Sequence, residues 1–124
     1  MNQKILVAED EQDIQELIEF TLRYGGYEVI CVLNGEEAYE VARKELPDLI
    51  LLDIRMPVMS GIEACKLLKS DPATQNIPIV FLSAKGQKSE IKEGFEVGAV
   101  DYLLKPFSPE ELNKRLKEIL EGDA

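Results

Sequence analysis

The sequence predicts a single α/β domain in which helices cover both faces of a five-stranded parallel sheet. Five short apolar runs alternate along the chain with five longer segments whose apolar residues recur at helical spacing. Four of the runs are continuously apolar, which is typical of strands buried on both faces of a parallel sheet. The connections are short, and strand–helix–strand units of this kind cross over right-handed. The prediction is one doubly wound (βα)5 domain over residues 1–124.

The first half of the chain supplies two strand–helix units before its central strand. Residues 5–8 are the first strand, and Gly25-Gly26 ends the following helix, whose apolar stripe is Ile14, Leu17, Ile18 and Leu22. Residues 27–33 are the second strand. Asn34 is the N-cap of the second helix, with Glu37 three residues later. Pro47 ends this helix, and its stripe is Ala38, Val41, Ala42 and Leu46.

The third strand carries the residue around which the site is organised. Residues 49–52 are continuously apolar and end in Asp53. An ionised carboxylate is costly inside a core, so Asp53 should lie where the strand emerges. Pro57 cannot continue a central strand, so the chain leaves the sheet just after Asp53. In open α/β sheets, ligands bind at the carboxyl ends of the strands, and Asp53 is therefore the candidate functional centre.

The second half of the chain continues the pattern. Ser60 and Glu63 form a capping box for a helix with inward Ala64, Leu67 and Leu68, and residues 71–78 are a polar loop. A strand at 79–82 precedes a helix at about 89–97, which has few inward residues (Ile91, Phe95) and contains Gly94. A fifth strand covers 100–104. Ser108 and Pro109 open the last helix, which Gly122 closes; its stripe is Leu112, Leu116, Ile119 and Leu120. Five such units fit the flavodoxin-like strand order 2-1-3-4-5 better than a six-stranded dinucleotide-binding order.

Composition limits the kinds of partner and metal. The net charge of −10 argues against direct binding of nucleic acid or an anionic membrane by this domain, and it suits cations and basic protein surfaces. No apolar run approaches membrane-spanning length and the first residues are polar, so a cytoplasmic location is expected. Cys31 and Cys65 are expected as reduced, core-filling residues. The chain has no His, so any metal here would be hard and oxygen-bound.

Five chemically matched groups follow the strands that meet at one edge of the sheet. They are Glu9 and Asp10 after the first strand, Asp53 after the third, Ser83 after the fourth and Lys105 after the fifth. Each has an ordinary explanation alone, as a helix-terminal charge, a turn residue or a solvated lysine. Together, the repelling carboxylates call for a cation such as Mg²⁺, and Lys105 and Ser83 suit phosphate oxygens. The set predicts phosphoryl transfer to a carboxylate.

The chain resembles the receiver domain of bacterial two-component response regulators from Lys4 to about Leu120. The segments that carry the resemblance are Val7-Ala8-Glu9-Asp10, Leu51-Leu52-Asp53-Ile54-Arg55-Met56-Pro57 with Gly61 beyond, Leu82-Ser83-Ala84, and Asp101-Tyr102-Leu103-Leu104-Lys105-Pro106-Phe107. Their order and spacing together are highly specific.

The resemblance implies a role for each site residue. Asp53 would accept a phosphoryl group from a phosphohistidine of a sensor histidine kinase or a histidine phosphotransfer protein. Asp10, Asp53 and the backbone carbonyl of Arg55 would bind Mg²⁺ directly, and Glu9 would reach it through water. Lys105 would contact the phosphate, Ser83 would turn toward it, and Tyr102 would swing inward. The Lys105–Pro106 bond would be cis. Small Ala84 would leave the pocket open, with basic Arg55 and Lys85 beside it.

The same resemblance implies a signalling switch that catalyses only its own phosphorylation and dephosphorylation. The added charge would rearrange the face formed by the fourth helix, fifth strand and fifth helix, and so control a downstream protein target or effector domain. A monomer or a weak phosphorylation-dependent dimer is expected. Whether the chain is a stand-alone receiver or part of a longer regulator stays open.

Three other functions fit the same residues less well than this switch does. An aspartyl-phosphate phosphohydrolase of the haloacid dehalogenase type would need a second Asp where Arg55 stands. A carrier of FMN would need a phosphate-cradling loop after the first strand, where Glu9-Asp10-Glu11 would repel phosphate. A degenerate receiver that serves only protein contacts would not need the five site groups. The receiver switch fits the residues best.

Overall fold

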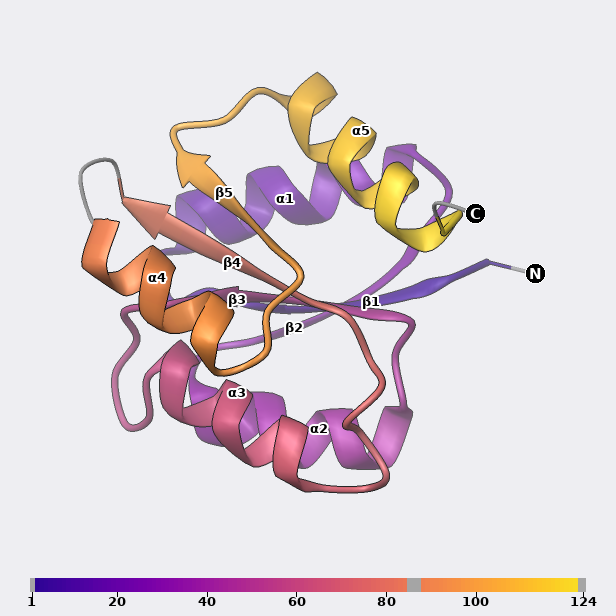
Figure 1. Cartoon of the computed structure of the whole chain (residues 1–124). Coiled ribbons are helices and arrows are strands. Elements are labelled where there is room, and N and C mark those ends of the chain that lie inside the picture. The colour runs from indigo at the N-terminus through magenta and orange to yellow at the C-terminus, as the bar shows by residue number, and fades with distance from the viewer. Residues whose placement is uncertain (1, 85–87, 123–124) are drawn as a thin grey trace.

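The computed structural model describes residues 2–84 and 88–122 and has the predicted architecture (Figure 1). The elements are β1 (Lys4–Ala8), α1 (Gln12–Tyr24), β2 (Glu28–Val32), α2 (Gly35–Glu45), β3 (Leu49–Asp53), α3 (Gly61–Ser70), β4 (Ile79–Ala84), α4 (Lys88–Glu96), β5 (Asp101–Lys105) and α5 (Pro109–Leu120). The strands are all parallel in the order β2-β1-β3-β4-β5. The predicted fold class and strand order are confirmed.

The sheet separates two hydrophobic cores. Alternate residues of one strand point to opposite faces, so Leu51 of β3 enters the core under α1 and α5 while Leu52 enters the core under α2 and α3. Figure 1 shows α1 and α5 on one side of the sheet and the other three helices on the opposite side. Every residue of β3 is buried. The strand that carries Asp53 is therefore the most firmly held element of the site.

Side-chain caps fix where three helices begin. Asn34, Ser60 and Ser108 each accept a hydrogen bond from the backbone N–H three residues later, at 2.9, 3.1 and 3.0 Å. Ser60 and Glu63 complete the predicted capping box. Glu37 differs, because its carboxylate accepts from the backbone N–H of Leu33 instead of from the N-cap. The starts of α2, α3 and α5 are where the sequence predicts them.

Four apolar residues predicted to face inward are instead exposed, by 38–56%: Leu17, Leu46, Leu67 and Phe95. Leu46 lies past the end of α2 in a left-handed conformation (φ 48°), which takes its side chain off the stripe. Leu17 and Leu67 lie at the margins of their stripes, next to positions that are fully buried. Phe95 packs edge-on against Tyr102, with ring centroids 5.7 Å apart, and stays at the surface.

Gly94 explains why α4 has so few inward side chains. A Cβ at Gly94 would lie 2.7 Å from the ring of Phe81 on β4, so the helix backbone itself rests on that ring. Gly94 is the one buried residue of α4 among those the structure describes. The glycine that weakens the helical pattern in the sequence is thus the residue that lets α4 approach the sheet.

Neither cysteine is in a disulfide, and both thiols are held in their unreactive form. Cys65 is buried and Cys31 is half-buried against the core under α1. Burial raises the pKa of both thiols to about 11, and for Cys31 the charge of Glu19 adds to this. Because the thiolate is the nucleophile, a rise of this size leaves roughly a hundredfold less reactive thiolate at neutral pH.

We therefore expect the folded protein to react slowly with iodoacetamide at pH 7, and the unfolded protein to react at both cysteines promptly. Peptide mapping by mass spectrometry, with and without denaturant, measures the two rates. Fast labelling of either cysteine in the folded protein would contradict this account of their burial.

No helix in residues 2–84 or 88–122 combines the length and the apolar character that crossing a membrane requires.

Candidate active site

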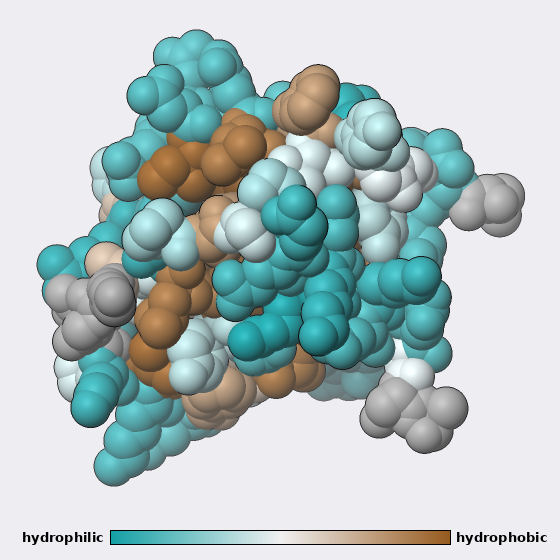
Figure 2. All heavy atoms as spheres, turned by 90° about the horizontal axis from the view of Figure 1, so that it is seen from above, coloured by the Kyte–Doolittle hydropathy of each residue, from teal (hydrophilic) through white to brown (hydrophobic). Residues whose placement is uncertain are grey.

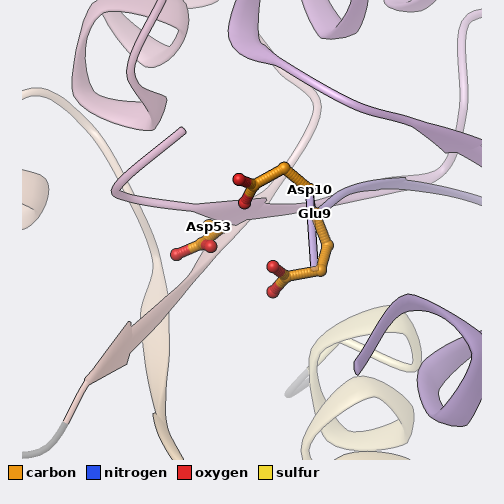
Figure 3. A group of neighbouring side chains, drawn as sticks. All are labelled: Glu9, Asp10 and Asp53. Atoms are coloured by element: carbon orange, nitrogen blue, oxygen red, sulfur yellow. The ribbon is translucent and has the colours of Figure 1, made fainter. Parts of the chain in front are cut away.

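Three carboxylates converge at the carboxyl edge of the sheet (Figure 3). Asp53 is the last residue of β3, and Glu9 and Asp10 directly follow β1, its neighbour in the sheet. Each side chain offers an oxygen that lies within 4.8 Å of the others. Glu9 is fully buried, Asp53 is 6% exposed, and Asp10 faces solvent. The protein therefore encloses Glu9 and Asp53, while the cluster is open to solvent at Asp10.

Lys105 is the cation that balances this cluster. Its Nζ lies 2.8 Å from Glu9 Oε1, 3.1 Å from Asp53 Oδ2 and 3.7 Å from Glu11 Oε1. Burial alone would lower the pKa of Lys105, but the contacts with Glu9 and Asp53 outweigh it and raise that pKa. Burial, together with the charge of Asp53, raises the pKa of Glu9 despite its contact with Lys105. The single ammonium of Lys105 contacts two buried carboxylates, those of Glu9 and Asp53, so the net charge of the cluster remains negative.

The donor set fits a hard divalent cation. Glu9 Oε1 is buried and makes no hydrogen bond of ordinary geometry to any described residue, although Lys105 Nζ is close to it. That ammonium is shared with Asp53, so the buried carboxylates exceed the cationic charge that faces them, and a further cation would offset the difference. Carboxylate oxygens, one of them open to solvent, suit Mg²⁺, which keeps several of its waters. These observations support the predicted Glu9, Asp10 and Asp53 as metal ligands.

Ser83 and Lys105 share a cavity of about 150 Å³ with Asp53. Ser83 is 1% exposed, and its Oγ donates weakly to the carbonyl of Ala84 at 3.3 Å. Ala84 also lines this cavity, and its small side chain leaves it open. The Lys105–Pro106 peptide is cis, as predicted. The structure therefore brings Glu9, Asp10, Asp53, Ser83 and Lys105 into one site.

Two predicted residues lie at the border of the site. Tyr102 is half-buried on β5, where its ring meets Phe95 and packs against the core on the side of α4. It does not line the cavity around Asp53 among the described residues. Arg55 lines that cavity, and its backbone N–H lies 3.4 Å from Asp53 Oδ1. Lys85, predicted beside the pocket, lies outside the described residues.

The loop after Asp53 is pinned at both of its ends by glycines. Gly61 N–H donates to the carbonyl of Ile54 at 2.9 Å, and Gly35 N–H donates to the carbonyl of Met59 at 2.9 Å. A Cβ at Gly61 would collide with the backbone carbonyl of Asp53 itself, and one at Gly35 would lie 2.5 Å from the Met59 carbonyl oxygen. The backbone beside the acceptor is thus held by contacts that only glycine permits.

Sequence reasoning missed two acidic residues of this cavity. Glu11 lines it and approaches Lys105, and its position directly after Glu9 and Asp10 was the available signal. Glu90 lines it from α4 and pairs with Arg55, Nε to Oε2, at 2.6 Å. Strand-end reasoning has no means of finding Glu90, because it comes from a helix whose docking depends on Gly94.

Apolar hollows flank the site on the side of α1 and α5, the face shown in Figure 2. One hollow of about 320 Å³ is lined by Ile14, Leu17, Phe107 and Pro106, together with Ala84 and Lys105 of the site region. A second, of about 330 Å³, shares Leu17 and includes the exposed rings of Phe20 and Tyr24. The site is therefore bordered mainly by apolar side chains on the side of α1 and α5.

Comparisons with known proteins agree on one family. The model of the response regulator receiver domain matches residues 5–117. The alkaline phosphatase synthesis transcriptional regulatory protein PhoP of Bacillus subtilis is 47% identical over 120 residues, which are 97% of this chain and 49% of PhoP. The phosphate regulon transcriptional regulatory protein PhoB of Pseudomonas aeruginosa is 47% identical over 116 residues, 94% of this chain and 51% of PhoB. The chain spans about half the length of these relatives.

Solved structures give the same result. The receiver domain of the sensor histidine kinase PA1611 from Pseudomonas aeruginosa, with a magnesium ion coordinated in its active site cleft, is 33% identical. Its TM-score is 0.92, with 98% of this chain and 100% of that chain covered. The chemotaxis response regulator CheY4 of Vibrio cholerae is 35% identical with a TM-score of 0.90, covering 96% and 99% of the two chains.

Proposed function

The chain belongs to the response regulator receiver domain family, and we propose on that premise that it is a phosphorylation-activated switch whose acceptor is Asp53. The observation that carries this assignment is the placement of Asp53. It ends the central buried strand, with two further carboxylates and the Lys105 ammonium gathered around it. As proposed, residues 1–124 form one receiver domain.

The proposed reaction transfers a phosphoryl group from a phosphohistidine of a sensor histidine kinase or a histidine phosphotransfer protein. An oxygen of Asp53 attacks phosphorus, the P–N bond breaks as the P–O bond forms, and the imidazole leaves with the electron pair. Lys105, now 3.1 Å from Asp53 Oδ2, turns to a phosphoryl oxygen, and the Ser83 hydroxyl donates to another. The chain thus acts on its own phosphorylation and dephosphorylation and does not turn over small metabolites.

Mg²⁺ is the proposed cofactor. Asp10, Asp53 and the backbone carbonyl of Arg55 would hold it directly, and Glu9 would hold it through water. When bound, the ion neutralises charge on the carboxylates and on the transferring oxygens. The excess negative charge of the cluster supports this role, since Lys105 alone cannot balance Glu9, Asp10 and Asp53.

The proposed output is a change in the face formed by α4, β5 and α5. Phosphorylation adds about −1.5 to −2 charge and three acceptor oxygens beside Ser83, whose present acceptor is only a distant carbonyl. Movement of Ser83 toward the phosphate makes room for the side chain of Tyr102, which projects from β5 and packs against α4. The relatives PhoP and PhoB are named transcriptional regulatory proteins, so a DNA-binding effector domain is the proposed target, with this acidic domain itself making no nucleic-acid contact.

We further propose that the domain works in the cytoplasm, away from membranes, as a monomer or a weak phosphorylation-dependent dimer. Intact-mass spectrometry tests the function itself, after incubation with Mg²⁺ and a small acyl phosphate and a fast quench. The expected result is one added phosphoryl group that requires Mg²⁺. The proposal fails if no mass is added at any quench time and beryllofluoride with Mg²⁺ leaves the melting temperature unchanged.

Magnesium should also stabilise the fold. A ligand that binds only the folded state at a hundred times its dissociation constant adds about 2.7 kcal/mol. For a domain of this size, that raises the melting temperature by roughly 10 °C. A Mg²⁺ titration followed by circular dichroism measures the shift, and Asp10→Asn, which removes one exposed ligand, should largely lose it. A flat titration would contradict the carboxylate site.

A further inference from the structure

The side chain of Gln15, near the start of α1, bridges the ends of two strands. Its Nε2 donates to the backbone carbonyl of Glu9 at 3.1 Å and to that of Val32 at 3.4 Å. Glu9 directly follows β1, and Val32 is the last residue of β2. A side-chain amide carries two N–H donors, so Gln15 can supply one to each carbonyl. The bridge therefore lies at the carboxyl edge of the sheet, beside the carboxylate cluster.

The backbone of Glu9 is tied to Val32 through both of its polar groups. Its N–H donates directly to the Val32 carbonyl at 3.2 Å, and its carbonyl is linked to the same acceptor through Gln15. The pairing of β1 with β3 ends at Ala8, so the Glu9 carbonyl lies beyond that ladder. Because Glu9 is fully buried, its carbonyl would be costly to leave without a donor, and Gln15 supplies that donor.

The direction of the Glu9 carbonyl influences where Asp10 points. The peptide unit that joins the two residues is planar, so the direction of this carbonyl fixes how the chain enters Asp10. The Glu9 carboxylate has holds of its own, the backbone N–H of Glu11 at 3.1 Å and the ammonium of Lys105. The Asp10 side chain is exposed, and it accepts no hydrogen bond from the part of the chain that the structure describes. The place of Asp10 in the cluster therefore depends on its backbone.

We propose that Gln15 is a positioning residue of the metal site, which holds the Glu9–Asp10 peptide so that the Asp10 carboxylate stays beside that of Asp53. The inference rests on the proposed Mg²⁺ cofactor, and it adds a residue that touches neither the ion nor the phosphoryl group. A neutral amide suits this role, because it supplies two donors without reducing the negative charge that attracts the cation.

The expected size of the effect follows from this indirect role. Residues that orient metal ligands without touching the metal typically change its affinity by about 10- to 100-fold when they are removed. Gln15 acts through a backbone carbonyl and not on a ligand oxygen, so its loss should fall at the lower end. We expect Mg²⁺ to bind about tenfold more weakly without the two donors.

The test compares Gln15→Met with Gln12→Met. Met is about as long as Gln and also favours helices, so Gln15→Met removes the two donors while α1 stays formed. Gln12 is the matched control, because it is exposed on the same helix and its amide donates to the Glu16 carboxylate, away from the cluster. Isothermal titration calorimetry of the unphosphorylated protein measures the Mg²⁺ dissociation constant. It should rise about tenfold in Gln15→Met and match the wild type in Gln12→Met.

A third variant, Gln15→Lys, separates positioning from a purely structural role. Its ammonium can donate to the same two carbonyls, but its positive charge by itself disfavours a second cation nearby. Positioning therefore predicts tighter Mg²⁺ binding by Gln15→Lys than by Gln15→Met, whereas charge alone predicts the reverse. Urea unfolding in the presence of EDTA measures the stability of each metal-free variant, so a change in affinity is read separately from a change in the fold.

Two results would overturn the inference. One is a dissociation constant for Gln15→Met equal to that of Gln12→Met, even if Gln15→Met is less stable without metal. The other is weaker binding by Gln15→Lys than by Gln15→Met. A wild-type protein that binds no Mg²⁺ would instead refute the proposed cofactor.

Discussion

Asp53→Asn should abolish Mg²⁺-dependent phosphorylation while the domain stays folded. The amide keeps the shape of the side chain but lacks the nucleophilic carboxylate, so incorporation from an acyl phosphate falls to background. The variant also removes one of two charges that Lys105 balances, and Glu9 retains Lys105 as its partner. Intact mass measures incorporation, and circular dichroism confirms the fold.

The control for this variant is Asp13→Asn, which removes a carboxylate from the exposed first turn of α1. It should incorporate phosphoryl as the wild type does. Peptide mapping of the wild type should locate the label on the segment that contains Asp53. Label that persists in Asp53→Asn would mean that another carboxylate is the acceptor.

Gly61→Ala should damage both stability and chemistry. The added Cβ collides with the carbonyl of Asp53, which is backbone and cannot turn aside as a side chain could. We expect a loss of about 3 kcal/mol in the free energy of unfolding, the upper end of the usual cost of overpacking. The loop must move away from the acceptor, and a shift of about 1 Å in a reacting group costs roughly a hundredfold in rate. Thermal unfolding and initial phosphorylation rates measure the two effects.

Gly25→Ala is the matched control for that prediction. Gly25 has an ordinary helical backbone (φ −78°), and a Cβ there would lie 3.2 Å from the end of the Asn113 side chain. Its phosphorylation rate should match that of the wild type, with a small change in stability. If Gly61→Ala behaves as Gly25→Ala does, the close contact with Asp53 does not constrain the loop.

The sequence predicts the fold well because the signals are local and agree with one another. Continuous apolar runs such as residues 49–52 indicate buried parallel strands, and caps such as Ser60 fix helix starts within one residue. Parallel strands then place their carboxyl ends together without further information. This geometric rule is why Glu9, Asp10, Asp53, Ser83 and Lys105 could be expected in one place.

What the sequence could not supply depends on packing between elements. Glu90 enters the site cavity only because α4 sits where Gly94 meets Phe81, and no spacing rule encodes that contact. The exposure of Phe95 has the same origin, since the helix approaches the sheet through a glycine and leaves the ring outside. Helical periodicity finds the stripe of a helix but not how far that helix stands from its neighbour.

Because α4 buries little of its surface, its outward residues can diverge between related domains. A helix that rests on its domain through one glycine can change its outward residues singly, because most surface substitutions alter stability by less than about 0.5 kcal/mol. The buried strand that bears Asp53 allows no such freedom. After gene duplication, two copies can therefore acquire different binding partners while the chemistry of the site stays the same. A cell can then keep many such signals separate with one conserved reaction.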